Sequence, residues 1–179
     1  MQHSSLNIGI TGHRILPVEC IPALSAEILA FYQKEIAQHG AENVTVLSHL
    51  AEGADTLCAS LALEAGLRLA IPLPMDMQEY RKDFSEEAAA EFDRLLSLAE
   101  LVFVVQPEDP VPPDPQRGFY YRQAGIYVAN NCDVLLAVWD GLERDTPDGA
   151  GTWETVKLAR KAGKRVFIPA SCRDSVSKG

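Results

Sequence analysis

The stretch Ser48-His49-Leu50-Ala51-Glu52-Gly53-Ala54-Asp55 separates two runs of different character. Residues 44–47 before it are apolar with β-branched side chains, and residues 56–65 after it are rich in alanine and leucine. This order predicts a strand, a turn of small residues and then a helix. Because the first turn of a helix has unpaired N–H groups and a partial positive charge, such a turn is suited to bind an anion.

The same order of strand, turn and helix recurs along the chain. Apolar runs predict six strands, at residues 6–11, 44–47, 67–73, 101–105, 133–139 and 165–169. Helical spacing, with glycine or proline near the ends, predicts helices at about residues 22–39, 54–65, 85–99, 117–129 and 152–162. This alternation predicts one α/β domain over residues 1–179: a Rossmann-like three-layer α/β/α sandwich with a mostly parallel sheet of about six strands.

Three segments carry more specific expectations. Residues 101–105 form an unbroken apolar run, which predicts a strand buried on both faces. Residues 75–82 predict a polar connection. Residues 107–116 contain five of the eleven prolines and predict a long loop, which is either a binding loop or a passive surface excursion. In the helix that follows, Tyr121 and Arg122 either contact a ligand or pack in the core, and the core interpretation is favoured.

Composition limits the class of protein. No apolar run approaches the roughly 20 residues that span a membrane, and residues 1–5 contain no secretion signal, so we expect a cytoplasmic protein. Nucleic acids are bound mainly through Lys and Arg on phosphates, so the net charge of −9 leads us to expect no nucleic-acid partner. The cysteines and histidines lack metal-binding spacing, and we expect reduced thiols, no metal site and no cofactor.

Candidate ligand-binding residues follow the predicted strands at three places. In open parallel sheets ligands bind beyond the carboxyl ends of the strands, so these turns are expected on one edge of the sheet. The candidates are Thr11, Gly12, His13 and Arg14 after the first strand; Ser48, Glu52, Gly53 and Asp55 after the second; and Asp140, Gly149, Gly151 and Thr152 after the fifth.

Each residue type suggests a role in binding a phosphorylated ligand. Glycines allow a backbone to approach a phosphate closely, and Arg14 can pair with a phosphate through two hydrogen bonds. A carboxylate does not suit a phosphate, so Glu52 and Asp55 are expected to meet ribose hydroxyls or to hold the turn. The turn at Gly149 to Thr152 is therefore the preferred phosphate site.

Common catalytic and nucleotide-binding motifs are absent from the sequence. There is no GxGxxG after the first strand, no GxxxxGK[ST] and no GxSxG, which argues against a dinucleotide fingerprint, a P-loop and a nucleophile elbow. Ser48 and His49 are adjacent, but neighbours in a strand point to opposite faces, so this pair is not evidence of a nucleophile.

Several motifs together resemble a known superfamily. Ser48-x-Leu50-Ala51-x-Gly53-Ala54-Asp55 followed by Ala62-Leu63-Glu64-Ala65-Gly66 resembles the signature of the DNA-processing protein A (Smf, DprA) domain. Gly149-Ala150-Gly151-Thr152 resembles the G-G-x-G-T motif of the LOG phosphoribohydrolases, and Tyr80-x-x-Asp83-Phe84 resembles an uncharacterised bacterial branch. Both families belong to the SLOG superfamily, and the resemblance covers roughly residues 6–170.

The resemblance implies three alternative functions. The first is binding of a nucleotide or nucleotide-derived ligand, of the AMP, ADP-ribose or NAD-derived type, in a sensor role. The second is a LOG-like N-glycosidase, in which Glu154 or Glu52 stabilises the transition state and Arg14 or Arg122 holds the phosphate. The third is a dimeric interaction protein with a vestigial pocket. Because relatives often form homodimers, the resemblance also implies a homodimer for any of the three. Against the second, the place of the LOG glutamate is occupied by Thr155, one residue after Glu154.

Overall fold

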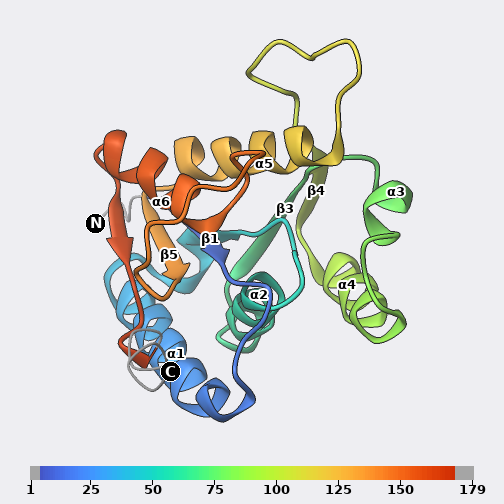
Figure 1. Cartoon of the computed structure of the whole chain (residues 1–179). Coiled ribbons are helices and arrows are strands. Elements are labelled where there is room, and N and C mark those ends of the chain that lie inside the picture. The colour runs from blue at the N-terminus through green and yellow to red at the C-terminus, as the bar shows by residue number, and fades with distance from the viewer. Residues whose placement is uncertain (1–4, 172–179) are drawn as a thin grey trace.

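The computed structural model describes residues 5–171, and its centre is one sheet of six parallel strands (Figure 1). The strands are β1 (Leu6–Gly12), β2 (Val44–Leu47), β3 (Arg68–Leu73), β4 (Leu101–Val104), β5 (Val134–Val138) and β6 (Arg165–Phe167), in the spatial order β4-β3-β2-β1-β5-β6. This confirms the predicted Rossmann-like α/β architecture. The strand order reverses between β1 and β5, and in open parallel sheets such a reversal is where ligands bind.

Helices cover both faces of the sheet. They are α1 (Ile21–His39), α2 (Ala54–Glu64), α3 (Met77–Arg81), α4 (Glu86–Leu98), α5 (Arg117–Asn131) and α6 (Thr152–Lys161), with short 3₁₀ turns at Val18–Cys20 and Ala41–Asn43. Helices α1, α2 and α4 lie on one face, and α5 and α6 lie on the other (Figure 1). The sheet is therefore the middle layer of three.

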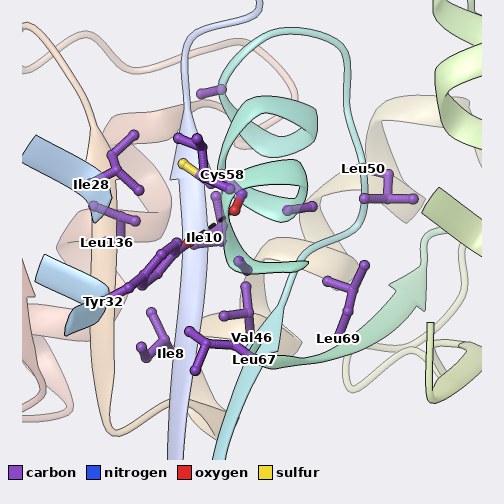
Figure 2. Close-up of a cluster of buried hydrophobic side chains, with 14 of the residues drawn as sticks. Ile8, Ile10, Ile28, Tyr32, Val46, Leu50, Cys58, Leu67, Leu69 and Leu136 are labelled. Atoms are coloured by element: carbon purple, nitrogen blue, oxygen red, sulfur yellow. Dashed lines mark hydrogen bonds between the residues drawn. The ribbon is translucent and has the colours of Figure 1, made fainter. Parts of the chain in front are cut away.

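The alternation of side chains along each strand divides the core in two. Ile8 and Ile10 of β1 and Leu136 of β5 point to the face of α1 and α2, where they join the larger cluster shown in Figure 2. Trp139 and the odd-numbered side chains of β5 point to α5 and α6. At Gly9 a Cβ would lie only 2.7 Å from a methyl of Val128, so this glycine allows α5 to pack directly on β1.

Local capping explains where several helices begin and end. The Ser85 hydroxyl accepts a hydrogen bond from the N–H of Ala88 and caps α4, and Gly40 has a φ of 80° at the end of α1. The polar connection expected at residues 75–82 contains a short helix, α3, that was not predicted from the sequence, and Asp76 caps it. Its carboxylate accepts from the N–H groups of Gln78 and Glu79.

The expectation that β4 is buried on both faces is wrong. This strand is the edge of the sheet, and Leu101, Val102 and Val104 are exposed. An unbroken apolar run is typical of a central parallel strand, but the run alone does not tell which strand has a neighbour on each side. Among residues 5–171 no helix has the length and apolar character needed to cross a membrane.

Candidate ligand-binding site

A pocket of about 460 Å³ lies beyond the carboxyl ends of β1 and β5, where the strand order reverses. Its walls come from the turn after β1, the loop between β2 and α2, helices α3 and α5, and the loop that leads from β5 into α6. Segments that are more than a hundred residues apart in the sequence therefore meet at one site. Pockets of this size and position commonly bind small molecules.

The turns after β1 and β2 are locked together by two glycines. The Ala54 N–H donates to the His13 carbonyl oxygen over 3.0 Å. A Cβ at Gly12 would overlap the side chain of Ala54, and a Cβ at Gly53, where φ is 94°, would overlap the Arg14 carbonyl. These glycines thus permit two backbones to pack, which is a different role from the phosphate approach expected from the sequence.

Asp55 organises the loop between β2 and α2 from inside. The Ser48 hydroxyl donates to Asp55 Oδ2 over 3.2 Å, and His49 Nδ1 lies 3.4 Å from the same oxygen. Burial raises the pKa of the Asp55 carboxyl, and His49, Ser48, the Ala51 backbone and Arg14 oppose that rise in decreasing order. Ser48 and His49 both contact Asp55, because both follow the last residue of β2 and the alternation of side chains along a strand does not apply there.

Leu50, in the same loop, has an unusual backbone. Its φ is 56°, a region that non-glycine residues rarely adopt, and its side chain is fully buried. Its N–H donates to the Ser48 hydroxyl over 3.2 Å. The loop is therefore held in a strained shape by one buried side chain and one local hydrogen bond.

Arg14 is a cation on the pocket wall with no ion pair to a carboxylate among residues 5–171. Its guanidinium lies 5.7 Å from the centre of the Tyr121 ring. The arginines at Arg144 and Arg122 are different, because they pair with Asp140 and Asp109 respectively. Arg14 therefore offers its charge to the pocket.

The loop into α6 is held by a glutamate of the helix itself. Glu154 Oε1 accepts hydrogen bonds from the N–H and the hydroxyl of Thr146. Glu154 Oε2 is buried, has no hydrogen-bond partner within the described residues, and lies 2.5 Å from where a Cβ at Gly151 would be. A second carboxylate, that of Asp148, accepts from the Ala150 N–H over 3.2 Å. The start of α6 is therefore surrounded by acidic groups.

Aromatic side chains form two parts of the wall. Trp139 and Trp153 stack with ring centroids 5.5 Å apart and planes 13° apart, next to α6. On the other side, Tyr121 of α5 lies near Tyr80 of α3, with centroids 6.0 Å apart. Flat apolar surfaces of this kind suit a nucleobase.

Tyr80 belongs to both the core and the pocket. It has no exposed surface, and its ring packs edge-on against Phe84 and Phe92. Burial raises the pKa of its phenol far above the usual value, so the hydroxyl stays protonated. That hydroxyl has no hydrogen-bond partner in the described part of the chain.

The structure brings together some of the residues predicted from sequence. Those that line the pocket are Thr11 to Arg14, Asp55, Gly151 and Thr152. The others lie outside its walls: Ser48, Glu52, Gly53, Asp140 and Gly149. Asp140 holds its own turn, accepting from the N–H of Leu142 and pairing with Arg144.

The three candidates for catalysis are also outside the pocket wall. Glu154 is bound to Thr146, and Glu52 is exposed to solvent. Arg122 pairs with Asp109 at the base of the proline-rich loop. No group of three or more His, Cys, Asp or Glu side chains within residues 5–171 is arranged to hold a metal ion.

Several wall residues were not among the predicted site residues, and they include His49, Tyr80, Tyr121, Thr146 and Trp153. The motif Tyr80-x-x-Asp83-Phe84 was visible, but it begins in a segment expected to be a polar connection. Tyr121 was expected in the core. A tyrosine has an apolar ring and a polar hydroxyl, so it can pack in a core or line a pocket. Which of the two occurs depends on the residues around it in the folded chain.

The proline-rich loop does not cover the pocket. It projects beyond α5 (yellow in Figure 1), and none of residues 107–116 lines the pocket. Buried Gln123 fixes its base, because its amide oxygen accepts from the N–H groups of Glu108 and Asp109 over 2.8 and 3.2 Å.

Comparison with known proteins gives the fold a context. No family model matches the sequence, and no curated protein matches it either. Among solved structures, DNA processing protein A (DprA) from Streptococcus pneumoniae superposes with a TM-score of 0.63 and 16% identity over 98% of this chain. DprA from Helicobacter pylori gives 0.61 and 16%, also over 98% of this chain and 74% of its own. The chain spans 57% of the length of the Streptococcus protein.

Two further structures share the arrangement. TM1055, which has a LOG-like fold, superposes with a TM-score of 0.53 and 14% identity over 97% of this chain and 81% of its own. The Moco carrier protein of Chlamydomonas rheinhardtii gives 0.50 and 20% over 92% and 75%. All four have SLOG-type folds. This chain shares the fold of these four structures. The resemblance read from its motifs is therefore confirmed for the fold.

The expectation that nucleic acid is not a partner is wrong, because the net charge does not exclude such a partner. The Helicobacter DprA structure, with the same SLOG-type fold, is described by its single-stranded DNA binding mode. Net charge sums over the whole surface, whereas binding depends on the local arrangement of cations. Here Lys161 and Arg160 are exposed at the end of α6 although the chain carries −9.

Proposed function

We propose that the pocket binds a nucleotide or a nucleotide-derived molecule, of the AMP, ADP-ribose or NAD type. The observation that carries this function is Arg14, a cation without an ion-pair partner among the described residues, on the wall of a pocket at the point where the strand order reverses. A guanidinium in that position is suited to grip a phosphate through two parallel hydrogen bonds.

The other walls supply what the remaining parts of a nucleotide need. The rings of Trp153 and Tyr121 offer flat surfaces for a base. The hydroxyls of Thr146 and Thr152 and the carboxylate of Asp148 are suited to sugar hydroxyls. The volume of about 460 Å³ is within the usual range for a small-molecule site.

Binding is favoured over cleavage by the positions of the acidic residues. The N-glycosidase alternative needs a carboxylate that faces the ligand, and Glu154, whose Oε1 holds Thr146, does not line the pocket. Glu52 is exposed and does not line the pocket. Because a protein with this fold is described as binding single-stranded DNA, a short oligonucleotide is a second probe beside the mononucleotides.

The test is a thermal-unfolding series with AMP, ADP-ribose, NAD, a cyclic nucleotide and a short thymidine oligonucleotide. A ligand present at about 100 times its dissociation constant adds roughly 2.7 kcal/mol and raises the melting temperature by about 5–10 °C at this chain length. Chromatography of the same mixtures reports any cleavage. Intact ligand after incubation supports binding, and free base supports the glycosidase.

The variant Arg14→Gln should lower the affinity for every phosphorylated probe that binds, by about tenfold or more. Arg94→Gln is the matched control, because Arg94 pairs with Glu91 on α4 and does not line the pocket. A panel in which no probe changes the melting temperature, or a ligand whose affinity survives Arg14→Gln, would contradict the function proposed.

A further inference from the structure

We infer that the phosphate or other oxyanion of the ligand binds between Arg14, His49 and Tyr80, and not at the N-terminus of α6. This subsite rests on the proposed function, and it adds the orientation in which the nucleotide lies in the pocket. Its chemical target is a group that only accepts hydrogen bonds, such as a phosphoryl group. The Arg14 guanidinium and the Tyr80 hydroxyl both donate, and the imidazolium form of His49 donates from both ring nitrogens. A ligand that binds in this way extends its neutral part toward Trp139 and Trp153.

The hydroxyl of Tyr80 is the clearest sign of a missing partner. It is fully buried at the pocket wall and makes no hydrogen bond to any described residue. A buried donor without a partner costs about 1–3 kcal/mol, and native proteins retain few of them without a reason. Tyr32 shows the ordinary case in the same protein. Its hydroxyl is equally buried and donates to the Cys58 carbonyl over 3.0 Å (Figure 2).

His49 is the second donor, and Asp55 orients it. Nδ1 of His49 faces the buried Asp55 carboxylate at 3.4 Å, so the ring turns Nε2 away from Asp55. His49 lines the pocket with about 18% of its side chain exposed. The Asp55 carboxylate is engaged by the Ser48 hydroxyl as well as by His49. Asp55 is therefore a positioning residue, and its charge is partly offset before it reaches the pocket.

Arg14 completes the group with a full positive charge. It lies over Tyr121, which in turn lies beside Tyr80. Arg14 and Tyr80 are thus both neighbours of Tyr121, and both line the same pocket as His49. Donors from the turn after β1, the loop after β2 and helix α3 thus meet on one side of the pocket.

The start of α6 is less suited to an anion. The N-terminus of a helix normally attracts a phosphate, and the motif Gly149 to Thr152 suggests that role for α6. In the folded protein the carboxylate of Glu154 lies against Gly151, and the carboxylate of Asp148 takes the Ala150 N–H. Two negative charges therefore occupy the place where a phosphate would bind.

The experiment measures the affinity of the intact chain for inorganic phosphate and for AMP by calorimetry, together with melting temperature. Tyr80→Phe should weaken both affinities by about tenfold or more, since it removes a hydrogen bond to a charged group. The melting temperature without ligand should stay the same or rise, because the variant removes a buried hydroxyl that has no partner. Tyr32→Phe is the matched control and should lower the melting temperature while leaving both affinities unchanged.

The results separate this subsite from the proposed function. AMP bound equally well by the wild type and Tyr80→Phe would overturn the subsite and leave nucleotide binding intact. Phosphate bound through Tyr80 while no nucleotide binds would keep the subsite and overturn the function. A gain in phosphate affinity in Glu154→Gln, with no loss in Tyr80→Phe, would place the anion at α6 and overturn the subsite. If neither phosphate nor AMP binds, the subsite is overturned as well.

Discussion

Gly53 joins two turns that are about forty residues apart in the chain. Its φ of 94° is accessible to glycine at little cost, and its Cα lies against the backbone of His13 and Arg14. The Ala54 N–H then donates to the His13 carbonyl. The position of Arg14 in the pocket therefore depends on a residue that does not itself face the ligand.

Gly53→Ala should lower the free energy of unfolding by about 3 kcal/mol, since it adds a forbidden backbone conformation to an overlap with the Arg14 carbonyl. Gly66→Ala is the control, because Gly66 has a similar φ of 77° but nothing within 4 Å of an added Cβ. That change should cost only about 1 kcal/mol. Denaturant unfolding of both variants measures the difference, and equal losses would show that the overlap is not important.

Burial of Asp55 makes its contribution to the free energy of unfolding fall as the pH rises. Its pKa is higher in the folded chain than its ordinary value of 3.8. Its contribution to stability is therefore fully present below pH 3.8, where the carboxyl is protonated in both states. That contribution is lost as the pH rises through the pKa of the folded state.

Asp55→Asn removes this titration and keeps an amide oxygen to accept from Ser48. The stability of the variant relative to wild type should therefore increase as the pH rises from about 4 to 7. His49, Arg14 and Tyr80 face the same carboxyl and are present in both proteins. Urea unfolding at several pH values measures the difference, and a difference that falls with pH would contradict the assigned environment of Asp55.

At the scale of elements, the base of the proline-rich loop is held by α5. Gln123 is buried, accepts from the N–H groups of Glu108 and Asp109, and donates to the Asp109 carboxylate over 2.7 Å. Asn130 adds a more exposed bond to Glu108. These contacts fix where the loop leaves the sheet without bringing it to the pocket.

Gln123→Ala should leave two backbone N–H groups without their acceptor and lower the free energy of unfolding by about 1–3 kcal/mol. Amide hydrogen exchange at Glu108 and Asp109 should become faster, and Asn130→Ala should change it much less. Affinity for AMP should be unaffected, because the loop does not line the pocket. A loss of AMP affinity in Gln123→Ala would show that the loop contributes to binding.

The elements themselves were largely predictable from the sequence. The end of α1 at Gly40 and the start of α4 after Ser85 follow from capping by those residues, which depends only on the neighbouring sequence. Two features of the fold were not predicted. The place of β4 at the sheet edge depends on strand order, and the short helix α3 is held by Tyr80 packing on Phe92. Strand order and the contact of Tyr80 with Phe92 join separate elements, and local patterns do not contain such contacts. The Asp76 cap of α3, in contrast, is a local signal that was not recognised in the sequence.

At the scale of the whole molecule, the site is made by convergence of several loops. The sequence placed the turns after β1, β2 and β5 on one edge of the sheet, and the strand order brings them to one pocket. The pattern of strands and helices in the sequence did not predict which side chains of these turns face the cavity. Gly53 and Ser48 stabilise the loop between β2 and α2 and do not line the pocket. Tyr80 does line it, although it lies in α3 and not in one of the three predicted turns.

The central claim is that a nucleotide binds in the pocket where the strand order reverses. Mapping of backbone amide chemical shifts during titration with AMP, or with whichever probe raises the melting temperature most, tests it most directly. The predicted result is a set of saturable shifts at residues 12–14, 49–51 and 150–153, with none on α1 or β4. Shifts confined to other surfaces, or no saturable shift with any probe, would contradict it.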